Sequence, residues 1–170
     1  MDHKLVFAGV GGQGIVLATR LIGTALTLKG IPVIPTENHG MATRGGSVLA
    51  FMKVGNYNSP LILYEEADIA VILHPDEYQN ATVYTNPDTF VVGYNTPKST
   101  VDIKETMERC SVHPRRANVV AAGLVLKHMG IDEETALSAL SILNKASQEN
   151  IKAIKVAYRE VSHAHVSATA

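Results

Sequence analysis

Apolar positions in the first 30 residues change from a short continuous run to a helical period. Residues 4–8, KLVFA, form an apolar run that ends at a cluster of glycines, which predicts a buried strand leading into a tight turn. Over residues 15–28 the apolar positions cover most of a helical surface, and Gly30 stands where a glycine commonly ends a helix. Strand, glycine-rich loop and helix together form the first half of a βαβ unit.

Further apolar runs predict the rest of a sheet. They are residues 31–35, 47–54 and 68–73, with residues 82–84 and 90–92 together supplying one or two more strands. Pro32 and Pro35 each remove a ladder donor from the first of these runs, so we expect that strand at a sheet edge or as a short piece. The second run is apolar enough for a central strand, and the third has parallel-sheet character and precedes a short helix led by Pro75. The count reaches five or six strands.

The last third of the chain has a helical pattern. Residues 119–129 predict a buried helix, and Asp132 and Ser147 stand at cap positions in front of two further helical periods. Residues 162–170 are small and polar with no apolar period, so we expect this tail to fray. Residues 1–161 therefore predict a single α/β domain of Rossmann-like type, with a mostly parallel, doubly wound sheet and a helical C-terminal third.

Length and charge narrow the class of protein. The chain has 170 residues, of which 46% are apolar, and this is the size of one ordinary domain. Its net charge of -1 lacks the basic excess that would neutralise several phosphates, so we expect no nucleic-acid binding. No apolar run approaches the ~18 to 20 residues that span a bilayer, and the N-terminus lacks a signal-peptide pattern. We therefore expect a cytoplasmic protein that does not bind membranes.

A single cysteine limits the chemistry of this chain. Cys110 alone cannot form an internal disulfide, hold a zinc ribbon or hold an iron–sulfur cluster. His113 lies close by in sequence, but nothing there supplies an oxyanion hole or an orienting carboxylate, so we expect an ordinary cysteine. The neighbouring Arg109, Arg115 and Arg116 predict a solvated turn, which we favour, or a patch that binds a partner.

The first candidate site is the segment GVGGQG. It satisfies the pattern G-x-G-x-x-G between a predicted strand and a predicted helix. Glycines let the backbone approach an anion, and the free N–H groups at the start of the helix favour negative charge. The alternative is a glycine turn that only brings helix and strand close, and Glu37, the acidic residue a dinucleotide site would need, follows two prolines. The candidate residues are Gly9, Gly11, Gly12, Gln13 and Gly14.

The second candidate site is the long polar loop over residues 36–46. Loops of this length are more often functional than purely connecting. Arg44 stands beside two glycines in a loop of small residues, so its guanidinium can reach a carboxylate or phosphate. The alternative is a surface arginine that pairs with a carboxylate of its own chain. The candidate residues are His39, Arg44, Gly45, Gly46 and Ser47.

Together the two loops resemble the gamma-type subunit of the 2-oxoacid:ferredoxin oxidoreductases, in particular the beta subunit of indolepyruvate oxidoreductase. The resemblance rests on GVGGQG at residues 9–14, HGMATRGGSV at residues 39–48, Ser59-Pro60 with Ala67-Asp68, and Asn150 in the last predicted helix. Branches that act on 2-oxoglutarate or pyruvate commonly have Tyr and Glu where this chain has His39 and Ala42. This departure favours the indolepyruvate-type branch.

The resemblance implies a complex that decarboxylates a 2-oxo acid on thiamine diphosphate with Mg, passes electrons through [4Fe-4S] clusters to ferredoxin, and releases an acyl group on coenzyme A. It implies that this chain is a non-redox subunit, without a catalytic residue, metal or cofactor of its own, that packs against the catalytic subunits. The candidate residues above, with Asn150, would then bind a cofactor of the complex or lie at a subunit interface. The isolated chain should be inactive.

The sequence is also compatible with three alternatives. The chain could be the gamma subunit of a pyruvate, 2-oxoisovalerate or 2-oxoglutarate enzyme. It could be a stand-alone nucleotide-binding Rossmann module, which would predict NAD binding by the isolated chain. It could also be a small-molecule sensor that uses the same loops without chemistry.

Overall fold

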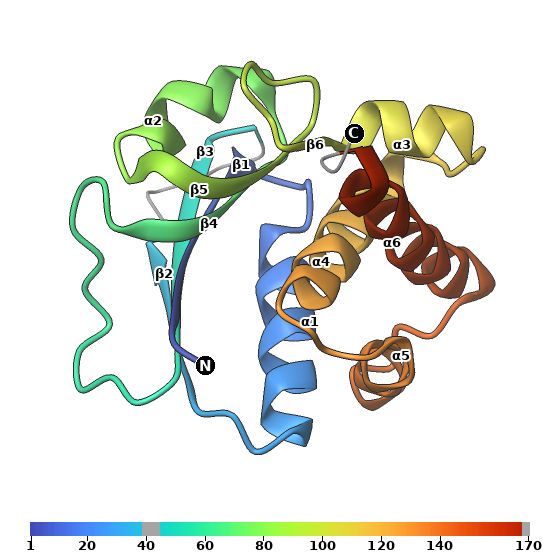
Figure 1. The fold of residues 1–170 in the computed structure, drawn as a ribbon, viewed down its shortest axis with the longest axis horizontal. Helices are drawn as coiled ribbons and strands as arrows, with labels where there is room; N and C mark the ends of the chain where they lie inside the picture. Colours follow the sequence, from blue (N-terminus) through green and yellow to red (C-terminus); the bar gives the residue numbers. More distant parts are fainter. Residues whose placement is uncertain (39–44, 168–170) are drawn as a thin grey trace.

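The computed structural model describes residues 1–38 and 45–167, which form a six-stranded sheet with helices on its faces (Figure 1). The strands are β1 (His3–Val10), β2 (Val33–Asn38), β3 (Ser47–Val54), β4 (Ala67–Ile72), β5 (Thr85–Gly93) and β6 (Val101–Asp102). The α-helices are α1 (Ile15–Leu28), α2 (Tyr78–Thr82), α3 (Ile103–Arg109), α4 (Ala117–His128), α5 (Glu133–Ile142) and α6 (Gln148–Ser167). Two short 3-10 helices, η1 (Pro75–Glu77) and η2 (Pro114–Arg116), precede α2 and α4.

The sheet has the order β2-β3-β1-β4-β5-β6. β3 runs antiparallel to both of its neighbours, whereas β1, β4, β5 and β6 are parallel to one another. The predicted single α/β domain with a mostly parallel sheet is therefore confirmed, and β2 lies at the edge that its prolines indicated. The intrusion of β3 separates β1 from β2, an arrangement that the apolar pattern does not encode.

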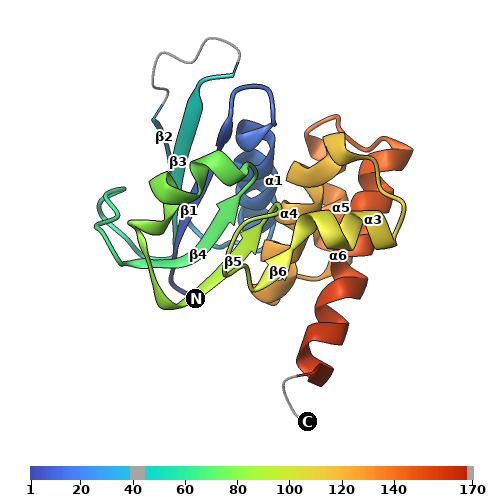
Figure 2. The same ribbon diagram turned by 90° about the horizontal axis from the view of Figure 1, so that it is seen from above.

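Alternate residues of β1 face two layers of unequal thickness. Leu5 and Phe7 belong to the main core, which α1, α4, α5 and α6 build on one face of the sheet. Val6 and Ala8 belong to two smaller clusters on the other face, where Ala81 of α2 packs against the sheet. Figures 1 and 2 show this division, with α2 alone on its side of the strands. The sheet thus presents its carboxyl edge between a thick and a thin layer.

The predicted helix ends are confirmed. Gly30 has φ 70° and its N–H donates to the carbonyl of Thr27, which closes the C-terminus of α1. The Asp132 carboxylate accepts the N–H of Thr135 at 2.8 Å at the start of α5. The Ser147 hydroxyl accepts the N–H of Asn150 at 3.3 Å at the start of α6. Local capping chemistry therefore fixes the frame of the helical layer.

Two segments differ from what the apolar pattern predicts. Residues 82–84 do not form a strand: they end α2 and turn into β5, because the buried Ala81 anchors this short helix on Ala8 and Ile72 of the sheet. The helix α3 was also not predicted, although the Asp102 carboxylate caps it by accepting the N–H groups of residues 104 and 105. A short polar helix gives too few apolar positions to establish a period.

The structure describes only part of the C-terminal tail that we expect to fray. Helix α6 continues to Ser167, so most of the tail expected to fray is helical, and residues 168–170 lie outside the described ranges. Fraying of residues 162–170 in solution stays a prediction. No helix within residues 1–38 and 45–167 is long and apolar enough to cross a membrane.

Candidate functional site

The two candidate loops meet at the carboxyl edge of the sheet. β1 leads through α1 to one side of the sheet and β4 leads through α2 to the other, so the direction of winding reverses between them. Open α/β sheets bind ligands in the crevice at such a point. β3 pairs its first residue, Ser47, with Val10 at the end of β1, which brings the end of the second loop beside the glycine loop.

The glycine loop is held in one conformation by its own glutamine. Gly12 and Gly14 have φ 96° and 79°, values that favour glycine. The Gln13 Oε1 accepts the N–H of Val10 at 2.9 Å, and its Nε2 donates to the carbonyl of Leu73 at 2.9 Å. Gln13 therefore ties the ends of β1 and β4 together, a structural role that leaves its amide little capacity for a ligand. The N–H groups of Gly12 and Gly14 find no acceptor within the described ranges.

Two of the glycines are required by close contacts. A Cβ at Gly9 would lie 2.9 Å from Gln13 Oε1 and 3.0 Å from a methyl of Ile15. A Cβ at Gly14 would lie 2.3 Å from Nδ2 of Asn118, which donates to the Gly14 carbonyl at 3.2 Å. Asn118 is only 5% exposed and comes from α4, so this bond ties the N-terminus of α1 to that of α4. Asn118 was not among the predicted site residues, and a polar residue inside an apolar helix is the signal that indicates it.

The end of the second loop is anchored on both sides. The Gly46 carbonyl accepts the N–H of Gly11 at 2.8 Å, and Gly45 has φ 93°. The Ser47 hydroxyl donates to a carboxylate oxygen of Glu77 at 2.6 Å, and the same oxygen accepts the amide of Asn80 at 2.7 Å. Glu77 is 6% exposed, so a buried carboxylate beyond β4 fixes this stem.

Two predicted residues of this loop have no described position. His39 and Arg44 lie outside the described residues, and their roles stay predictions. The predicted neighbours Gly45, Gly46 and Ser47 do lie beside the glycine loop. The structure therefore brings both candidate segments together, as far as it describes them.

A cavity of about 520 Å³ opens beside the glycine loop. Its lining residues are Gly12, Gln13, Leu73, Tyr94, Pro114, Arg115, Arg116 and Ala117. Helix α1 begins at this cavity with no side-chain cap and no acidic residue in its first turn. Helix α4 continues from η2, where the carbonyls of His113 and Pro114 accept the N–H groups of Arg116 and Ala117. Helix N-termini carry free N–H groups and partial positive charge, so the site favours an anion.

Two arginines add charge at the same cavity. Arg115 is exposed and forms no ion pair with any residue in the described part of the chain. Arg116 pairs with Glu149 of α6, and the hydrogen bond from its guanidinium holds the pKa of that carboxyl below its usual value. The favoured prediction of a merely solvated turn is incomplete, because η2 brings these arginines next to a loop about 100 residues earlier.

Asn150 lies apart from the cavity. Its side chain is 4% exposed, and its Nδ2 donates to the carbonyl of Lys145 at 2.8 Å, which fixes the connection from α5 to α6. Its Oδ1 has no hydrogen-bond partner in the described ranges. Asn150 does not line the cavity of the glycine loop, and its predicted part in cofactor binding or in an interface stays a prediction.

The cysteine and histidine after α3 have separate roles. Cys110 is the C-cap of α3, and Nδ1 of His113 accepts the N–H of Arg115 at 3.2 Å at the start of η2. The imidazole therefore serves a cap and makes no bond to the thiol. Within residues 1–38 and 45–167, no three side chains of His, Cys, Asp or Glu gather closely enough to hold a metal ion.

Comparison with known proteins places the chain in a family. The model of the pyruvate ferredoxin/flavodoxin oxidoreductase family matches residues 4–160, so the chain belongs to this family. It is 37% identical over 92 residues to the indolepyruvate oxidoreductase subunit IorB of Archaeoglobus fulgidus, covering 54% of this chain and 46% of that subunit. It is 30% identical over 130 residues to the common gamma subunit of the pyruvate/ketoisovalerate oxidoreductases of Pyrococcus furiosus, covering 74% and 68%. The resemblance seen in the sequence is confirmed.

Other matches differ in extent. A 2-oxoglutarate synthase subunit KorC of A. fulgidus is 24% identical over 167 residues, covering 92% of this chain and 87% of that subunit. The first indolepyruvate relatives, from A. fulgidus and Methanothermobacter thermautotrophicus, are matched over less than half of their own length, 46% and 39%.

Solved structures support the fold. The pyruvate oxidoreductase subunit PORC of Thermotoga maritima superposes with a TM-score of 0.68 at 19% identity, over 93% of this chain and 96% of that one. The 2-oxoglutarate:ferredoxin oxidoreductase of Magnetococcus marinus, with 2-oxoglutarate, coenzyme A and succinyl-CoA bound, gives a TM-score of 0.71 at 20% identity. This chain corresponds to 31% of that larger one, so its fold recurs as one part of a longer polypeptide.

Proposed function

We propose that the chain is the non-redox gamma-type subunit of a 2-oxoacid:ferredoxin oxidoreductase complex and that the carboxyl edge of its sheet faces the catalytic subunit. The observation that carries this proposal is the junction of the glycine loop with the stem of the second loop, beside an anion-favouring cavity at the reversal point of the sheet. Both segments contain the motifs that the family resemblance uses.

The donor set of this chain argues for a supporting role. A [4Fe-4S] cluster needs four thiolates and the chain has one cysteine, so the residues present do not fit that group. No cluster of three acidic or histidine side chains within the described ranges fits a metal–diphosphate site. We infer that subunits carrying thiamine diphosphate and iron–sulfur clusters supply the redox chemistry and the contact with ferredoxin.

We infer that the cavity holds part of a coenzyme A molecule. Its phosphates require N–H donors and cations, which the start of α1 and the guanidinium of Arg115 provide. When bound, the coenzyme supplies the thiol that accepts an acyl group. The residues that would hold its phosphates are Gly12, Arg115 and, from the second loop, Arg44.

An indolepyruvate-type complex is the branch we favour. The relatives named indolepyruvate oxidoreductase subunit IorB share 37% and 40% identity with the matched segments, whereas the 2-oxoglutarate subunit shares 24%. His39 and Ala42 occupy the positions where the 2-oxoglutarate and pyruvate branches commonly have Tyr and Glu. Enzymes for pyruvate, 2-oxoisovalerate or 2-oxoglutarate remain the alternatives.

The stand-alone nucleotide-binding module has less support. A dinucleotide site places the acidic residue of the second strand next to β1. Here β3 lies between β1 and β2, so Glu37 is two strands, or about 10 Å, away from β1. The isolated chain should therefore show no saturable binding of NAD by calorimetry. Saturable binding would favour the module over the subunit.

Kinetics of the assembled complex test the anion site. Replacing Arg115 or Arg44 with Ala should raise the KM for coenzyme A by about ten- to a hundredfold, the value of one charge-assisted contact of about 1.5–3 kcal/mol, with a smaller effect on the KM for the 2-oxo acid. Arg109→Ala is the control, because Arg109 pairs with Glu160 of α6 and does not line the cavity. Equal effects on both substrates, or none, would contradict the assignment of coenzyme A to this cavity.

A further inference from the structure

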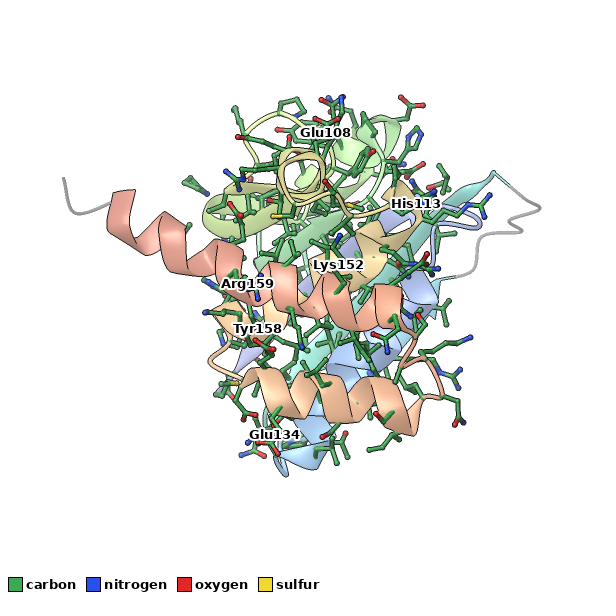
Figure 3. All side chains as sticks on the ribbon, turned by 90° about the vertical axis from the view of Figure 1, so that its right-hand side faces the viewer. Glu108, His113, Glu134, Lys152, Tyr158 and Arg159 are labelled. Atoms are coloured by element: carbon green, nitrogen blue, oxygen red, sulfur yellow. The ribbon has the colours of Figure 1, made fainter. Side chains whose placement is uncertain are left out.

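A second charged surface lies on the far side of the helical layer, between α3 and α6. It is a groove of about 390 Å³ lined by Cys110, Gln148, Ile151, Lys152, Lys155, Val156 and Arg159. The two apolar residues of α6 form its floor, since Val156 is 5% exposed and Ile151 is partly buried. Figure 3 views this side of the molecule, with Lys152 and Arg159 labelled along α6. We call it the α3–α6 groove.

The charge of this groove is unbalanced. Its lining contains three cations and no acidic residue. The two nearby glutamates of α6 are already occupied, because Glu149 pairs with Arg116 and Glu160 pairs with Arg109. Lys155 and Arg159 form no ion pair with any side chain that the structure describes.

The row of like charges along the groove destabilises α6. Lys155 and Arg159 are four residues apart, and Lys152 is three residues before Lys155, so like charges face one another along one side of α6. Like pairs at these spacings destabilise a helix, whereas a merely solvated face usually alternates its charges. Lys152 is held in place by a 2.8 Å hydrogen bond from its Nζ to the carbonyl of Ser111, which keeps its charge at the rim of the groove.

The spacing of the cations favours one kind of partner. A site for phosphate gathers several donors around one point and usually uses backbone N–H groups. These three cations instead extend over eight residues of a helix, a rise of about 10 Å at 1.5 Å per residue, where the backbone N–H groups are used within the helix. A row of carboxylates on a protein surface matches a row of cations above an apolar floor.

We propose that the α3–α6 groove docks an acidic segment of a partner protein. Lys155 and Arg159 pair with its carboxylates, Lys152 borders the contact, and the apolar floor receives an apolar side chain of the partner. This surface involves neither the glycine loop nor its cavity, so the proposal stands independently of the anion site.

Alkylation of Cys110 measures occupancy of the groove, because Cys110 lines it and is the single cysteine of the chain. A short poly-glutamate peptide at low salt should slow alkylation of the full chain by iodoacetamide, and added salt should remove the effect. In the variant Lys155→Glu with Arg159→Glu, the peptide concentration for half protection should rise at least about tenfold, from two lost pairs and new repulsion. Rates with and without peptide are compared within each variant.

A matched control separates the groove from net charge. Arg20→Glu with Lys98→Glu changes the net charge equally at two exposed residues that do not line the groove, and protection should persist. Inorganic pyrophosphate at the same charge concentration should protect poorly. Equal loss in both double variants, absence of protection by the peptide, or equal protection by pyrophosphate would each overturn the proposal.

Discussion

Replacement of Gly14 by Ala tests the link between the glycine loop and α4. Gly14 is the N-cap of α1, with φ 79°, and its carbonyl accepts the Nδ2 of Asn118 at 3.2 Å. A Cβ on Gly14 would lie 2.3 Å from that nitrogen and 3.1 Å from the Cγ of the same side chain. Asn118 is buried inside the helical layer, so its amide cannot swing into solvent. The substitution must therefore displace the amide or the start of α1.

Two effects add up in this variant. An alanine in the left-handed region costs about 1–2 kcal/mol. Loss of the hydrogen bond that satisfies a buried amide costs a further 1–3 kcal/mol or so. The free energy of unfolding should therefore fall by about 2–5 kcal/mol. Gly30→Ala is the matched control, because Gly30 has φ 70° and a Cβ added there would meet no atom within 4 Å, so only the first effect applies.

Urea denaturation of the two variants measures the difference. Gly14→Ala should be less stable than Gly30→Ala by about 1–3 kcal/mol, the value of the lost bond. In an Asn118→Ala background that difference should shrink, because the atom in the way is gone. Equal destabilisation by the two substitutions, or an unchanged difference without Asn118, would contradict the contact between Gly14 and Asn118 as the cause.

Three further predictions concern single contacts. The hydrogen bond from the Lys29 ammonium, whose Nζ lies 2.5 Å from the carboxylate, lowers the pKa of Asp132. The Asp132 carboxylate therefore stabilises the fold above about pH 4, and this stabilisation is lost as the pH falls through the lower folded pKa. Asp132→Asn should flatten the acid limb of a plot of Tm against pH. The Tyr158 hydroxyl donates to the carbonyl of residue 131 at 2.9 Å, and burial raises the pKa of this hydroxyl. Tyr158→Phe should therefore lower the free energy of unfolding, measured in urea, by about 1–2 kcal/mol. An unchanged free energy of unfolding would contradict the importance of this hydrogen bond. Glu77→Ala removes the acceptor of the Ser47 hydroxyl, and the neighbouring Gly46 carbonyl accepts the N–H of Gly11. The substitution should therefore speed amide hydrogen exchange at Gly11 by about tenfold. An unchanged exchange rate would mean that the Glu77 contact does not stabilise the Gly11 hydrogen bond.

Much of the fold follows from local pattern. The strand at residues 47–54, the helix ends at Gly30 and Asp132, and the position of β2 at an edge are all recoverable, because apolar period, capping chemistry and proline act over a few residues. The antiparallel insertion of β3 between β1 and β2 is not recoverable in this way. Strand pairing depends on which partner a strand meets in the folded chain, and the apolar period of the strand's own sequence does not specify that partner.

The candidate site also contains residues that local sequence predicts and residues that only the fold brings together. The glycine loop is visible because G-x-G-x-x-G lies in one stretch of sequence. Asn118 and Glu77 are not among the predicted site residues, and Arg115 is predicted only as part of a basic turn, because each acts at the carboxyl edge of the sheet only after the fold brings it there from a distant segment. Gln13 shows the opposite case: its place in the motif predicts a ligand contact, whereas both ends of its amide bind the protein's own backbone.

The most direct test of the proposed subunit is purification of the native protein with identification of its stoichiometric partners. We expect co-elution with subunits that contain thiamine diphosphate and iron–sulfur clusters, and oxidation of a 2-oxo acid by the assembly. The isolated chain should show no visible absorption from iron. Elution of the chain alone, or a cluster spectrum from the purified single chain, would contradict it.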